Sequence, residues 1–150
     1  MENQDAKNKI SVGLIITKDQ MSNNQIFPDE VKKDISDSPY YLLIFISRED
    51  VVKINCFPLY TDMIKKVLIK LTEFTPDIVN GISRVFKDLE LQKKEIIHIT
   101  GVCYEMEDCY YEAFISGTVF KREGITEAIN DKLTSLANIL NVVIEDIPRL

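Results

Sequence analysis

The alternation of apolar and polar residues divides the chain into short strands and two amphipathic helices. Before residue 60, three runs rich in β-branched residues predict strands: ISVGLIIT (10–17), YYLLIFIS (40–47) and VVKINCF (51–57). The second run lacks alternation, which indicates a central strand buried on both faces. Arg48, Glu49 and Asp50 separate the last two runs, so we expect a hairpin there. The polar segment 18–25 predicts a loop, and FPDEVKKDIS predicts one or two helical turns beginning at Pro28.

The segment 60–74, YTDMIKKVLIKLTEF, fits more than one pattern. As a helix, it leaves only Ile69 outside an apolar arc of ~140° that holds Met63, Ile64, Val67, Leu68, Leu71 and Phe74. As a strand from Lys66, it alternates well, and only Leu68 is out of place. A helical turn over 61–65 followed by a strand over 66–72 is a third solution. Periodicity alone leaves all three open.

The pattern after residue 74 is clearer. Thr75 can cap a helix, Pro76 suits the first helical position and Asp77 favours the helix dipole, which predicts a helix over 76–90. IIHITGV (96–102) and CYYEAFIS (109–116) predict two strands joined by 104–108. A second helix is predicted over 124–141, and VVIEDI predicts a last strand over 142–147. The inward residues of the second helix should be Ile125, Ile129, Leu133, Leu136 and Leu140.

From Lys66 onward, the order strand, helix, strand, strand, helix, strand is a split βαβ unit, the ferredoxin-like arrangement. The predicted fold class is α+β: a ferredoxin-like antiparallel sheet with two helices on one face. A β-rich extension over residues 10–65 and a disordered tail over residues 1–9 precede this segment, which runs over residues 66–150.

The stretch KVLIKLTEFTPDIVNGISRVFKDLEL followed by EIIHITGV resembles an ACT domain, a small regulatory module that binds amino acids and related metabolites. The resemblance covers about residues 66–147. It rests on a strand that runs into a polar turn, with a proline at the start of an apolar-faced helix. The family usually has Asp before this proline and Gly after it, whereas the turn here is Glu73-Phe74-Thr75-Pro76-Asp77. The resemblance implies a four-stranded sheet that pairs with a second copy and a ligand bound between the copies.

A second, weaker resemblance is to the longin and roadblock group of small-GTPase partners. It uses GLIITKDQ as the opening strand and requires a helix over 60–74. A helix through 60–74, together with no pairing between the strands 66–72 and 96–102, would refute the ACT resemblance and favour this one.

The strands 96–102 and 109–116 have a predictable register if their loop closes symmetrically. One face then pairs Cys103 with Cys109, Gly101 with Tyr111, Ile99 with Ala113 and Ile97 with Ile115. This face is largely apolar and should lie under the helices. The other face pairs Val102 with Tyr110, Thr100 with Glu112, and His98 with Phe114.

This register separates the candidate chemical groups. His98 and the two cysteines point to opposite sides, which argues against a zinc site, so we expect no metal. Cys103 and Cys109 are either small semi-buried apolar residues or a redox pair that forms a reversible disulfide. The other face carries His98, Thr100, Tyr110, Glu112 and Phe114. We keep three interpretations of this face: an exposed strand surface without function, a partner interface, or a ligand contact.

Composition narrows the function classes. A 150-residue chain with 45% hydrophobic residues can bury a core, and its net charge of −6 argues against nucleic acid as a partner. The longest apolar run falls far short of the ~20 residues that span a bilayer, so no membrane contact is expected. The polar first nine residues predict a cytoplasmic protein. No catalytic or cofactor motif is visible, so we expect neither enzymatic activity nor a cofactor.

The sequence therefore predicts a non-catalytic regulatory or interaction module that forms a homodimer or a higher homo-oligomer. An amino acid or similar metabolite would bind at the helix start, where Asp77, Ile78 and Val79 offer free backbone N–H groups. Asp77 would hold the amino group of such a ligand. The predicted site is Thr75, Pro76, Asp77, Ile78 and Val79. The alternatives are a scaffold for a small GTPase or other protein partner, and a thiol redox or metal sensor.

Overall fold

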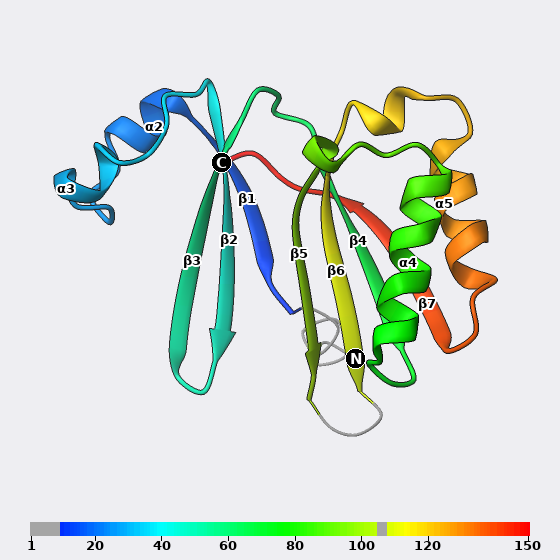
Figure 1. Ribbon diagram of the computed structural model, residues 1–150. Helices are drawn as coiled ribbons and strands as arrows, with labels where there is room; N and C mark the ends of the chain where they lie inside the picture. Colours follow the sequence, from blue (N-terminus) through cyan, green and yellow to red (C-terminus); the bar gives the residue numbers. More distant parts are fainter. Residues whose placement is uncertain (1–9, 105–107) are drawn as a thin grey trace. The chain divides into compact units, whose positions relative to one another are not determined.

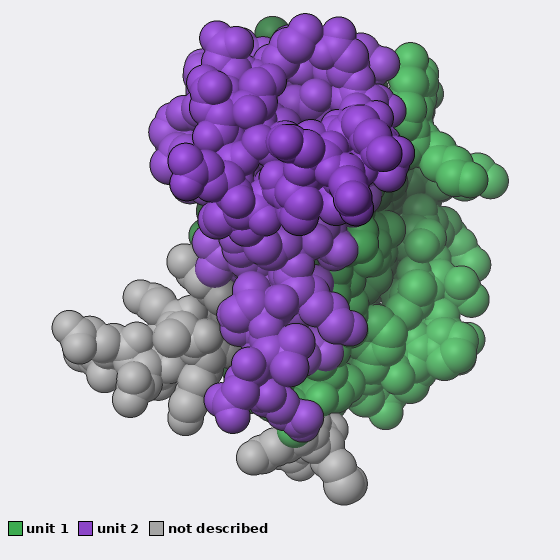
Figure 2. Space-filling view, turned by 90° about the vertical axis from the view of Figure 1, so that its left-hand side faces the viewer, with its two compact units in different colours: residues 1–10, 63–146 green, residues 11–62, 147–150 purple. Residues whose placement is uncertain are grey.

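The computed structural model describes residues 10–104 and 108–150. These residues form two compact units, coloured separately in Figure 2. Unit 1 comprises Ile10 and residues 63–146, and unit 2 comprises residues 11–62 and 147–150. The division thus falls after Asp62 rather than after Lys65, and residues 147–150 belong to unit 2 rather than to the ACT-like segment. The tail predicted over residues 1–9 lies outside the described residues.

Unit 2 contains a three-stranded antiparallel sheet in the order β1-β2-β3, made by β1 (Val12–Thr17), β2 (Tyr40–Arg48) and β3 (Val51–Leu59) (Figure 1). The central position predicted for β2 is confirmed, since Leu42 and Ile44 are completely buried. The hairpin is also confirmed, but its turn is shorter than predicted because Arg48 still pairs with Val51. Glu49 and Asp50 alone make the turn, with φ values of 49° and 65°. Two left-handed residues suit the twist of a tight hairpin.

The loop predicted over 18–25 is wrong, because α2 (Lys18–Ser22) follows β1 directly. Thr17 Oγ1 accepts the backbone N–H of Gln20 at 3.2 Å, and Gln20 Oε1 accepts the N–H of Thr17 at 2.9 Å. This reciprocal cap satisfies two backbone donors and starts the helix within a polar sequence. The turn expected after Pro28 is α3 (Asp29–Lys32). A hydrophobic core of unit 2 consists of Ile16, Met21, Tyr41 and Leu43, and Met21 is the buried residue that α2 contributes to it.

Residues 147–150 complete the β1 edge of the unit 2 sheet. The N–H of Ile15 donates to the carbonyl of Pro148 at 2.9 Å, and the N–H of Leu150 donates to the carbonyl of Ile15 at 2.9 Å. Arg149 Nη1 lies 2.9 Å from Asp62 Oδ2. This segment therefore pairs with a strand from the opposite end of the sequence.

Unit 1 contains a four-stranded sheet in the order β5-β6-β4-β7, and every neighbouring pair is antiparallel. Its strands are β4 (Ile64–Leu71), β5 (Ile96–Cys103), β6 (Cys109–Ser116) and β7 (Ile139–Asp146). The predicted α+β class with antiparallel sheets is confirmed, and the strand order is that of a ferredoxin-like sheet. The pairing expected between 66–72 and 96–102 is wrong, because β6 lies between β4 and β5.

β4 resolves the ambiguous segment 60–74. It is a strand that begins at Ile64, so the complete helix and the helical turn over 61–65 are both wrong. The longin-like resemblance loses the helix that it requires. Val67, Ile69 and Leu71 face the helices and are fully buried, as strand alternation predicts.

Both long helices cover one face of the unit 1 sheet (Figure 1), as predicted. They are α4 (Pro76–Asp88) and α5 (Ile125–Thr134), and the short 3₁₀ turns η1 (Lys93–Glu95) and η2 (Val119–Lys121) precede β5 and α5. The core between helices and sheet includes Ile78, Ile82, Val85 and Phe86 of α4, and Ile125, Ile129 and Leu133 of α5.

The second helix is shorter than the predicted 124–141. Asn138 adopts a left-handed φ of 71°, and its carbonyl accepts the N–H of Thr72 at 3.0 Å. The chain reverses at this residue, and β7 begins at Ile139 instead of residue 142. Leu140, predicted to point inward from the helix, lies on β7 and is 56% exposed. Pairing with β4 prevails over the helical periodicity here.

The register of β5 and β6 is confirmed from the pair Cys103 and Cys109 to the pair His98 and Phe114. The exception is Ile97. A bulge between Ile96 and His98 places Ile96, not Ile97, opposite Ile115. An extra residue of this kind is common in edge strands, and β5 is an edge strand of this sheet.

Candidate functional site

A pocket of about 330 Å³ opens in unit 1 where β4 runs into α4. One wall comes from the β4–α4 turn and the first turn of the helix, and the other from the turn between α5 and β7. The lining residues are Glu73, Thr75, Asp77, Ile78, Gly81, Leu136, Ala137 and Asn138. This volume lies near the lower end of the ~300–1,000 Å³ range of small-molecule sites.

Thr75 fixes the start of α4. Its Oγ1 accepts the N–H of Ile78 at 3.3 Å, and its carbonyl accepts the N–H of Val79 at 3.1 Å. The prediction of three free donors here is therefore wrong for Ile78 and Val79. Among the described residues, only the N–H of Asp77 has no partner at this helix start. Capping thus removes most of the anion-binding capacity of the helix end.

Asn138 on the opposite wall is held by Thr72. Besides the backbone bond between the two residues, Thr72 Oγ1 donates to Asn138 Oδ1 at 3.1 Å. The carboxamide oxygen is thereby occupied. The amide nitrogen of Asn138 has no partner within residues 10–104 and 108–150, and it can donate to a ligand.

The pocket has an acidic rim and an apolar interior. Glu73 and Asp77 are both exposed, and no Lys or Arg lines the pocket. Ile78 is 7% exposed and forms part of the helix-facing core. This combination favours a ligand with an ammonium group and a small apolar portion.

The predicted binding residues are only partly brought together. Thr75, Asp77 and Ile78 line the pocket, whereas Pro76 and Val79 do not. Sequence reasoning missed Glu73 and Gly81, and it missed residues 136–138 because it extended the second helix through them. The signal available for that turn was Asn138, since Asn tolerates the left-handed conformation that ends helices.

The predicted partner face does gather on one side of β5 and β6, opposite the helices, but it is not open. Tyr110 is 2% exposed, and Glu112 and Phe114 are completely buried. His98 and Thr100 are half-buried, with Thr100 Oγ1 at 2.9 Å from His98 Nε2. Burial lowers the pKa of His98. The prediction of an exposed strand surface is therefore wrong.

Glu112 can be buried on this face because Lys66 of β4 neutralises its charge. Lys66 Nζ lies 2.7 Å from Glu112 Oε2, 3.6 Å from Glu145 Oε1 and 5.4 Å from the centre of the Phe114 ring. Lys66 itself is 2% exposed. A charged pair with this burial is part of the packing rather than a ligand-binding surface.

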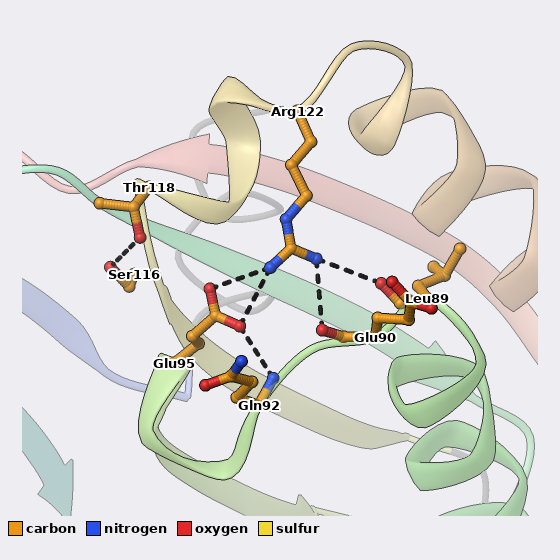
Figure 3. Close-up of polar contacts among 7 residues, drawn as sticks. All are labelled: Leu89, Glu90, Gln92, Glu95, Ser116, Thr118 and Arg122. Carbon is orange, nitrogen blue, oxygen red and sulfur yellow. Dashed lines mark hydrogen bonds and ion pairs between the residues drawn. The ribbon is translucent and has the colours of Figure 1, made fainter.

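A second polar cluster surrounds Arg122 (Figure 3). Arg122 Nη1 donates to the carbonyls of Leu89 and Glu90, both at 3.3 Å, and Nη2 reaches the two Glu95 carboxylate oxygens at 3.2 and 3.3 Å. The Arg122 side chain thus caps the carboxyl end of α4 and links it to η1. These contacts join three separate segments of unit 1, which is a structural role for Arg122.

Cys103 and Cys109 are joined by a disulfide, whereas Cys56 is a free thiol. Burial raises the pKa of Cys56 to about 11. In the described part of the chain, no three His, Cys, Asp or Glu side chains gather closely enough to hold a metal ion. Within the same residues, no helix combines the length and apolar character needed to cross a bilayer.

No family model matches the chain, and no curated protein sequence matches it significantly. Among solved structures, the chain is similar to a dimeric ferredoxin-like protein of unknown function from Thermobifida fusca. The identity is 15%, the match covers 56% of this chain and 89% of that chain, and the TM-score is 0.33.

Proposed function

We propose that this protein is a non-catalytic regulatory module that binds an amino acid or a similar small metabolite in the pocket at the start of α4. One observation carries the proposal: Glu73 and Asp77 line a pocket that also contains an apolar surface and the amide of Asn138. The ACT resemblance of the β4–α4 segment favours the same location.

The pocket supports a specific mode of binding. The ligand's ammonium group would lie between the carboxylates of Glu73 and Asp77, and its carboxylate would accept from the N–H of Asp77 and the amide nitrogen of Asn138. Its side chain would pack on Leu136 and Ala137. A phosphate is disfavoured because two carboxylates would repel it.

Self-association is part of the proposal, because the ACT resemblance implies a ligand bound between copies. β5 and β7 form the two edges of the unit 1 sheet, and an edge strand carries backbone groups that can pair with a second chain. Light scattering during size-exclusion chromatography measures this directly. A strict monomer at high micromolar concentration would contradict the self-association but not the pocket.

Ligand binding can be tested by a thermal-shift screen against the twenty amino acids, nucleotides and simple amines, with calorimetry on each hit. A ligand at ~100 times its dissociation constant stabilises the folded state by ~2.7 kcal/mol.

Asp77→Asn and Glu73→Gln should each weaken binding about threefold to tenfold, since each removes one charge contact. Asp88→Asn, at the other end of α4, is the matched control and should leave the affinity unchanged. If a ligand binds the two pocket variants as tightly as the parent protein, its site lies elsewhere. A screen without hits would refute the proposal.

A further inference from the structure

The disulfide closes the end of the β5–β6 hairpin on the side that faces the helices. Cys103 and Cys109 are directly opposite each other, with 4.0 Å between their Cα atoms. Cys109 is 2% exposed and belongs to the unit 1 core, whereas Cys103 is exposed. Of the two cysteines, Cys103 is therefore the one on the solvent side of the disulfide.

The next pair on the same face of the hairpin supports the pocket turn. Gly101 faces Tyr111, and a Cβ atom on Gly101 would lie 2.3 Å from Cζ of Phe74. The Phe74 ring thus lies directly on the Gly101 backbone, and it stacks on Tyr111 with 6.4 Å between ring centres. Phe74 stands between Glu73 and Thr75, which both line the pocket. The disulfide is consequently two residue pairs away from the platform that holds the pocket turn, on the same face of the hairpin.

We propose that thiol–disulfide exchange at Cys103 and Cys109 controls the order of the turn 73–77 through the contact of Phe74 with Gly101 and Tyr111. The crosslink holds the end of the hairpin closed. Without it, the terminal pairs of the two strands open more often, and the ring of Phe74 loses its platform during each opening. The effect on ligand affinity rests on the function proposed above, whereas the effect on the turn does not.

The exchange needs only low-molecular-weight thiols and their disulfides. A thiolate attacks the accessible Sγ of Cys103, forms a mixed disulfide and releases the Cys109 sulfur as a thiolate, which takes up a proton. A second thiolate then attacks the sulfur of the small molecule in the mixed disulfide and releases Cys103. In total, the protein disulfide gains two electrons and two protons, and two small thiols become one small disulfide. Oxidation follows the reverse path.

Hydrogen exchange of the protein without ligand tests this coupling. Protein carrying Cys56→Ser, so that only the pair remains, is equilibrated with reduced or oxidised glutathione, and the redox state is verified by mass. Reduction should accelerate exchange of the amides in 72–79 on the order of tenfold. Peptides from β2 serve as the internal control and should not change. Equal exchange of 72–79 in both states, or a pair that oxidised glutathione cannot close, would overturn the proposal.

Phe74→Leu provides the second arm. Loss of the ring should accelerate exchange of 72–79 in the oxidised protein, and reduction should then add little. If reduction has the same effect in Phe74→Leu as in the parent protein, the coupling does not pass through Phe74 and the proposal is wrong. Because no ligand is used, failure here leaves the amino-acid site untouched, and an empty ligand screen leaves this result untouched.

Discussion

Replacing Lys66 by Met should be among the most destabilising single changes in unit 1. Lys66 and Glu112 are 2% and 0% exposed, and their charged groups lie 2.7 Å apart. Removing one partner of such a buried pair costs ~3–5 kcal/mol, because the remaining charge loses its compensation. A domain of this size has a total stability of only ~5–15 kcal/mol. Lys66→Met should therefore remove a large part of the free energy of unfolding.

The surroundings of Lys66 limit the effect of removing Glu112. Glu112→Leu leaves Lys66 with Glu145 at 3.6 Å and with the ring of Phe114, so the loss should lie near the lower end of the same range. The double variant Lys66→Met/Glu112→Leu removes both charges and should lie within ~1 kcal/mol of the parent protein.

Urea unfolding followed by circular dichroism measures these differences, with the slope compared between variants. Lys65→Met is the matched control on the same strand. Lys65 pairs with Asp146 at 3.0 Å, but the two side chains are 27% and 80% exposed, so its loss should cost no more than ~1 kcal/mol. A Lys66→Met variant as stable as the Lys65 control would refute the reasoning. So would a double variant whose loss of unfolding free energy equals the sum of the two single losses.

Three further outcomes are expected. Gly101→Ala should lose ~1–3 kcal/mol of unfolding free energy, because its new methyl group overlaps the Phe74 ring. In a Phe74→Ala background this loss should largely disappear. Additive losses in the double variant would contradict the overlap as the cause. Burial lowers the pKa of His98, so the unfolded chain binds a proton at a higher pH than the folded chain. Stability should thus fall as the pH drops below ~6.5, and His98→Gln should show a smaller fall between pH 7.5 and 5.5 in thermal melts; equal falls would contradict the assignment. Arg122→Gln should cost ~1 kcal/mol in urea unfolding, because the lost contacts with Glu95 and two carbonyls are partly exposed to solvent; an unchanged midpoint would contradict the capping role.

Local patterns predicted most of unit 1 because its helix starts and strands carry their own signals. Thr75, Pro76 and Asp77 fix the start of α4 whatever surrounds them. β4 remained ambiguous for a physical reason. Leu68, the residue that broke the alternation, packs on the other face of the sheet with Ile10 and Tyr110, next to the buried Lys66, so the strand is buried on both sides. A central strand of this kind has no clear period.

The candidate site was only half predictable, because its two walls come from distant parts of the sequence. The wall beginning at Glu73 follows from the turn and cap signals. The other wall depends on Asn138, whose position is fixed by its hydrogen bonds to Thr72, and no local pattern contains that contact. The same limit explains the error about Glu112. A hairpin register shows which face a residue occupies, but it does not show that Lys66 of another strand will neutralise it in a buried position.

The pairing of residues 147–150 with β1 has a consequence for biosynthesis. The β2–β3 hairpin can form as soon as its own residues are available, but the partner of Ile15 is made only after all of unit 1. At ~5–20 residues per second, translation of unit 1 leaves the β1 edge unpaired for several seconds. An unpaired edge strand can pair with other chains, so we expect the risk of aggregation to be raised during this interval.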